Sequence, residues 1–129
     1  MHRNLRLVTA ATILALTAAP AMGAVMGAEE FYQRATKLKK KGALAVFARG
    51  EIKRLVNEVK VAGEKVKSTR LSAEAAGKKG RYCPPQPPRQ MGTEEYLKGL
   101  SAIPAAERAR IDLVEATTRI LEKKYPCKG

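Results

Sequence analysis

Residues 82–127, YCPPQPPRQMGTEEYLKGLSAIPAAERARIDLVEATTRILEKKYPC, decide the fold, because they carry the only two cysteines of the 129-residue chain. We predict one disulfide between Cys83 and Cys127, since two cysteines in an exported protein most often pair. The chain-entropy model assigns about 4 kcal/mol of stability to the closure of such a loop. The wide spacing differs from the C-x-x-C pattern of redox sites, and two cysteines do not complete a zinc site.

The loop opens with the segment CPPQPP at residues 83–88. Proline fixes its own backbone and pushes the preceding residue towards extended geometry, so this segment is not expected to be helical. We interpret it as a stiff connector that the disulfide holds at one end. A polyproline ligand is the alternative interpretation.

Helical segments are predicted to follow the connector. Thr93 is expected to cap the first, and Pro104 to occupy the first position of another turn. Asp112 begins the last helix, in a D-x-x-E capping box with Glu115. Apolar faces recur at helical spacing: Tyr96, Leu97 and Leu100 in the first, and Leu113, Ala116, Thr117, Ile120 and Leu121 in the last.

Residues 28–41 predict a helix upstream of this loop. Glu29 and Glu30 suit its N-terminal end and a run of lysines suits its C-terminal end, where Gly42 stops it. Its apolar face is narrow, and a partly frayed, solvated arm is the alternative.

Residues 43–76 form the longest periodic segment and predict an amphipathic central helix. Its stripe is Ala48, Ile52, Leu55, Val56, Val59, Ala62, Val66, Thr69, Ala73 and Ala76. The pattern fits one long helix or two joined near Gly63, and Gly50 and Gly63 predict either bends or close neighbours. Lys53, Lys60 and Lys67 lie away from the stripe and are the candidate basic contact face.

The fold class predicted from these segments is all-α, a small bundle of four to five helices with one long central helix, closed by one disulfide. Residues 22–129 are expected to form a single helical domain, with the N-terminal helices in 28–76 and the disulfide-closed segment in 83–127.

Residues 1–21 predict a signal peptide for export to the periplasm. Arg3 and Arg6 give a positive start, an apolar run follows, and Ala19-Pro20-Ala21 fits a cleavage site. A membrane anchor is the alternative, but the apolar run is shorter than the roughly 20 residues of a span. The processed protein is therefore expected not to be transmembrane.

The residue types present argue against catalysis. The single histidine, His2, falls in the predicted signal peptide, so the hydroxyl side chains lack their commonest activating base. We therefore predict a non-enzyme without cofactor or metal. The net charge of +13 attracts anionic partners. Nucleic acid is not expected, because the lysines lack interleaved aromatic residues and the chain is exported, whereas an anionic envelope surface is a candidate.

The C-terminal half resembles the Rap/Tai family of immunity proteins for type VI secretion amidase effectors. The motifs that carry the resemblance are Tyr82-Cys83-Pro84-Pro85, a short helix around Tyr96-Leu97, the turn Ile103-Pro104-Ala105-Ala106 and the closing Tyr125-Pro126-Cys127. The resemblance implies a small periplasmic, helical, disulfide-bonded protein that binds and blocks a cell-wall amidase. The upstream half departs from the family pattern, so no partner-contacting residue is transferred.

The expected function is therefore that of an exported periplasmic binding protein with a protein partner, which the resemblance identifies as a cell-wall amidase effector. Two alternatives come from other classes. One is a helical periplasmic chaperone or stress protein, and the other is a basic protein that binds the cell envelope.

Overall fold

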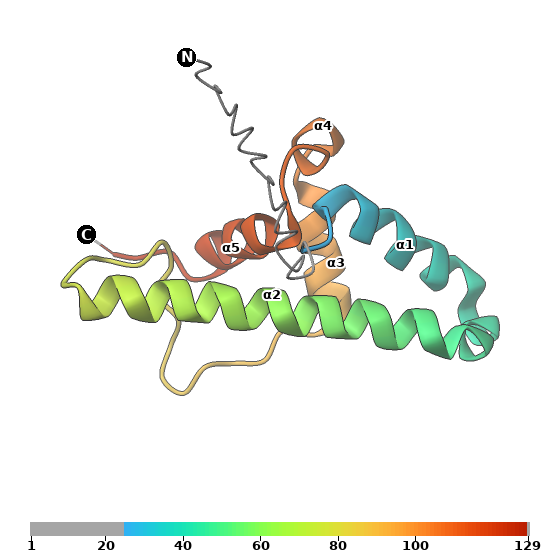
Figure 1. Cartoon of the computed structure of the whole chain (residues 1–129), viewed down its shortest axis with the longest axis horizontal. Coiled ribbons are helices and arrows are strands. Elements are labelled where there is room, and N and C mark those ends of the chain that lie inside the picture. The colour runs from blue at the N-terminus through green and yellow to red at the C-terminus, as the bar shows by residue number, and fades with distance from the viewer. Residues whose placement is uncertain (1–24, 129) are drawn as a thin grey trace, which may run out of the picture.

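The computed structural model describes residues 25–128, in which all regular secondary structure is helical (Figure 1). Its elements are α1 (Ala28–Lys41), the 3-10 helix η1 (Gly42–Ala48), α2 (Arg49–Ala75), α3 (Thr93–Ala102), α4 (Ala105–Arg108) and α5 (Leu113–Lys124). The prediction of an all-α bundle with one long central helix is confirmed. The predicted signal peptide at residues 1–21 lies outside the described residues.

The first two long helices form a hairpin whose turn is η1 (Figure 1). α1 has the predicted bounds, and Gly42 ends it with φ 54°, a left-handed conformation that favours glycine. The central helix begins at Arg49 and not at residue 43 as predicted, because residues 42–48 form the tighter 3-10 turns that reverse the chain. The start of the predicted stripe therefore belongs to the turn.

α2 is a single helix of 27 residues, so of the two predicted arrangements the structure has one long helix and not two helices joined near Gly63. Gly63 does not divide it, and Gly50 lies within its first turn. A Cβ atom placed on either glycine would find no other atom within 4 Å. The prediction that these glycines mark bends or close neighbours was wrong.

The core forms where α3 and α5 meet the hairpin. Leu100 and Leu113 are its largest fully buried side chains. Phe31 of α1 packs edge-to-face on Tyr96 of α3, with ring centroids 6.0 Å apart. The Tyr96 hydroxyl shares a 2.7 Å hydrogen bond with Thr117 Oγ1, and burial raises the pKa of Tyr96 to about 12.

A short antiparallel bridge ties the start of α1 to the start of α5. The backbone N–H of Ala28 donates to the carbonyl of Ile111 at 3.0 Å, and that of Leu113 donates to the carbonyl of Met26 at 2.9 Å. These two bonds fix the entry of the chain into α1 against the C-terminal helices.

The helix starts of the C-terminal segment differ in detail from the prediction. Gly92, not Thr93, is the N-cap of α3, and Pro104 precedes α4 as its N-cap instead of opening it. Asp112 caps α5 as predicted, accepting the Glu115 N–H at 2.8 Å. The Glu115 carboxylate does not complete the capping box, because it binds two arginines.

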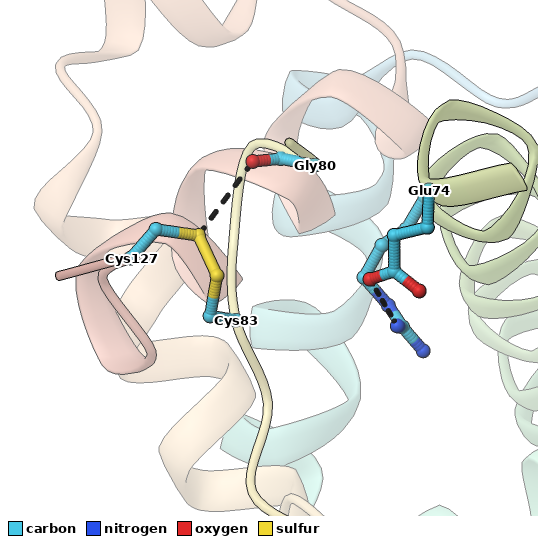
Figure 2. The surroundings of a disulfide bond; sticks show 5 residues. Glu74, Gly80, Cys83 and Cys127 are labelled. Carbon is cyan, nitrogen blue, oxygen red and sulfur yellow. Dashed lines mark hydrogen bonds and ion pairs between the residues drawn. A yellow bond between two sulfur atoms is a disulfide. The ribbon is translucent and has the colours of Figure 1, made fainter. Parts of the chain in front are cut away.

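The disulfide between Cys83 and Cys127 is present as predicted, with the two Cα atoms 4.9 Å apart. Figure 2 shows it beside Gly80, whose carbonyl oxygen lies 3.6 Å from Cys127 Sγ. The Cys83 N–H donates to the carbonyl of Tyr125 at 2.8 Å, so a backbone hydrogen bond runs alongside the bridge. The proline segment after Cys83 is not helical, as expected.

Within residues 25–128, no helix is long and apolar enough to cross a membrane.

Candidate binding groove

An open apolar groove of about 580 Å³ lies between α1, α2 and α3. Its walls come from these three helices, from η1, from Thr117 and Leu121 of α5 and from the end of the connector. They include Phe31, Ala35, Leu38, Ala45, Ile52, Leu55, Val56, Val59, Gly63, Met91, Tyr96 and Leu97. Apolar walls of this size suit an apolar ligand or an apolar segment of another chain.

The groove exists because only part of the predicted stripe on α2 is covered. α2 packs mainly against α5, and Leu55, Ala62 and Val66 are buried. Ile52 and Val56 are left 37% and 62% exposed. Each belongs to the same face by spacing, so their exposure reflects the absence of a covering element among the described residues.

Four of the polar side chains that line the groove are paired with one another. Lys39 of α1 forms an ion pair with Glu94 of α3 at 2.6 Å, and both side chains are exposed. Tyr96 and Thr117 bond each other below the apolar walls. The groove therefore offers apolar contact, with a neutralised ion pair at its edge.

The three lysines of the candidate basic face are all exposed on α2. Lys60 stands one helical turn after Val56, and Lys67 stands one turn after Gly63, so both lie beside positions that line the groove. Lys53 follows Ile52 directly. None of the three forms an ion pair with a carboxylate in residues 25–128. None of the three lysines lines the groove itself, and Lys67 lines a separate surface depression on α2.

Other charged side chains form an ion-pair network at the disulfide end. Arg81, next to the bridge, contacts Glu115 at 2.7 Å and Glu122 at 2.6 Å. Arg119 binds Glu115 from the neighbouring turn of α5 at 2.9 Å. Hydrogen bonds from Arg81, together with one from Arg119, lower the pKa of the Glu115 carboxyl to about 2. These contacts fasten the connector to α5.

Sequence reasoning missed the buried Arg108 at the end of α4. Its side chain is 7% exposed, pairs with Glu29 of α1 at 2.6 Å and lies 4.1 Å from the centre of the Tyr32 ring. It also donates to the carbonyl oxygens of Leu100 and Ile103. An arginine in a polar turn carries no local signal of burial, since its partners come from distant elements.

The exposed apolar turn was also missed. Leu44, Val46 and Phe47 of η1 are 65%, 55% and 86% exposed. The sequence did hold a signal: GALAVFA is a continuous apolar run without helical periodicity. The prediction that places this run at the start of the central helix is therefore wrong.

No group of three or more potential metal ligands occurs among residues 25–128. Comparison with protein-family models, curated proteins and solved structures gave no match.

Proposed function

We propose that this protein is an exported, non-catalytic binding protein whose groove accepts an apolar segment of a partner protein. The observation that carries the proposal is the open apolar groove of about 580 Å³ between α1, α2 and α3. Its wall exposes Ile52 and Val56, two large apolar side chains on one continuous helix of 27 residues. Burial of such side chains under a partner segment removes apolar surface from water and favours binding.

Charge defines the partner further. Lys53, Lys60 and Lys67 are exposed on α2, the helix that also supplies Ile52 and Val56 to the groove, and they form no ion pair with a described carboxylate. They favour a segment that carries acidic side chains beside its apolar ones, because opposite charges at the edge of an interface steer and orient binding. The resemblance of residues 82–127 to the Rap/Tai family makes a type VI secretion amidase effector the partner to test. The bound protein would then block the amidase's active-site groove.

The test is co-expression in the periplasm with an amidase effector from the same organism. We expect the wild-type protein to restore growth and V56D to lose protection, with Kd raised at least about tenfold, because the substitution buries an unpaired charge. L71D is the matched control, since Leu71 is an exposed apolar residue of α2 outside the groove. Absence of complex and of protection for the wild-type protein would contradict the proposal.

A periplasmic chaperone is the second candidate. The exposed apolar side chains of η1 and of the groove wall favour it, because unfolded clients bind through apolar surface. Such a protein should suppress the aggregation of several unrelated clients at stoichiometric amounts. A tight complex with one amidase and no effect on aggregation would favour the first candidate.

A further inference from the structure

The apolar turn η1 is a second surface, separate from the wall of the groove. Leu44, Val46 and Phe47 are all more than half exposed, and they stand within four consecutive residues. None of these three lines the groove, although Ala45 between them does. A cluster of large apolar side chains in solvent is costly, so it indicates a surface that another phase or molecule covers.

Exposed cations flank η1 on both sides. Lys40 and Lys41 precede it, and Arg49 and Lys53 follow it on the first two turns of α2. None of the four forms an ion pair with a carboxylate in the described part of the chain. Carboxylates nearby are already engaged, since Glu51 binds Arg34 at 2.5 Å. The turn thus carries a positive field around an apolar tip.

We propose that η1 inserts into the interfacial region of an anionic phospholipid bilayer. Phe47, Leu44 and Val46 would enter the boundary between headgroups and acyl chains, while the flanking lysines and arginine contact headgroup phosphates. Lysine and arginine suit this position because their aliphatic stems can lie against apolar surface while the charge stays in water. This inference goes beyond the proposed function, because it assigns a different partner and a surface that shares only Lys53 with the candidate basic face.

The position of η1 in the fold supports this occupant. η1 forms the end of the α1–α2 hairpin, away from the C-terminal end of the chain (Figure 1). A projecting tip can enter a bilayer without displacing the rest of the protein. A second copy of the chain is a poor cover, because two tips with the same cations would repel each other.

The test uses F47W as a reporter, since the sequence contains no tryptophan. The purified protein is mixed with vesicles of phosphatidylcholine with and without phosphatidylglycerol. We expect the indole emission to shift to shorter wavelength only with phosphatidylglycerol, and to be quenched by brominated acyl chains. Rising salt should reverse the shift, because it screens the attraction of the cations to the headgroups.

Sedimentation with the same vesicles gives an independent measurement. F47S is expected to lower the partition coefficient about tenfold, as is the charge reversal K40E with K41E. L71S and K123E are the matched controls, because Leu71 and Lys123 are exposed and lie outside the turn. Thermal unfolding of each variant verifies that it is folded.

Three outcomes would overturn the proposal. In the first, F47S binds vesicles as well as the wild-type protein. In the second, the protein sediments with the vesicles but the indole emission of F47W does not shift. Headgroup attraction or the N-terminal segment would then account for the binding, without insertion of η1. In the third, the shift appears without vesicles and grows with protein concentration, so that a second copy covers the turn.

Discussion

The two ends of α2 lie in contrasting surroundings. At its C-terminal end the chain is fastened by the disulfide and, through Arg81, by ion pairs to Glu115 and Glu122. At its N-terminal end α2 joins η1, where Phe47 is 86% exposed and the flanking lysines Lys40 and Lys41 form no ion pair with a carboxylate of residues 25–128. The C-terminal end of α2 is held by covalent and electrostatic contacts, whereas the N-terminal end lies beside exposed apolar and basic side chains.

This difference indicates that contacts at the C-terminal end of α2 stabilise the fold, whereas exposed side chains at its N-terminal end are available for binding. Core and ion-pair residues contribute to the free energy of unfolding, whereas exposed apolar residues contribute little to it and can be used for binding. Substitutions at the disulfide end should therefore change stability, and substitutions of the exposed apolar side chains of η1 should change binding alone. The predictions below test this division in order of expected effect.

Removal of the disulfide should have the largest effect. We expect C83A with C127A to lower the free energy of unfolding by about 4 kcal/mol, because the unfolded chain regains the freedom of the loop. Urea unfolding of the oxidised wild-type protein and the double variant measures this difference. F47S serves as the comparison and should stay within about 0.5 kcal/mol of the wild type. Equal losses in the two variants would refute the division between the ends.

Replacement of Arg108 should come next. R108M is expected to cost about 3 kcal/mol, since Glu29 loses its ion pair with Arg108, and the carbonyl oxygens of Leu100 and Ile103 lose the guanidinium donor. The matched control is R110M, because Arg110 is exposed two residues away. Chemical denaturation measures both. If both variants lose a similarly small free energy of unfolding, the Arg108–Glu29 ion pair does not hold α4 against α1.

The pH dependence of stability should report the network at the disulfide end. The ion pairs with Arg81 and Arg119 lower the pKa of Glu115 from an ordinary value of 4.5 to about 2. A lowered folded-state pKa gives stability that is present above pH 4.5 and is lost as the pH falls towards about 2. We expect E115Q to flatten this decline in unfolding experiments across that range. E64Q, at an exposed carboxylate of α2, should leave the decline unchanged.

The smallest effects concern two glycines of the hairpin. G63A should stabilise the protein by about 0.5–1 kcal/mol, because alanine favours the helix and the added Cβ meets no atom within 4 Å. G42A should destabilise it, since Gly42 has φ 54° where a Cβ is strained even in open space. Thermal unfolding compares the two, and effects of the same sign would contradict this assignment.

The sequence predicted the helices and the disulfide better than it predicted which of their residues are buried. The bounds of α1, the cap at Asp112 and the disulfide all follow from local signals, namely terminal charges, a capping residue and a single cysteine pair. The sequence places the apolar run of η1 in the central helix, because composition alone does not separate a short apolar turn from a helix start. The groove could not be predicted, because Ile52 and Leu55 belong to the same stripe and only one of them is covered.

The sequence by itself determined that this protein is helical and where most of its helices lie, because periodicity, caps and glycine stops act over a few residues. It also determined the disulfide, since Cys83 has one partner available. Only the tertiary structure decided which part of the α2 stripe is buried and which forms the groove. It also decided that Arg108 is buried and that Phe47 is exposed. Burial depends on the elements that pack against a residue, and these come from distant parts of the chain.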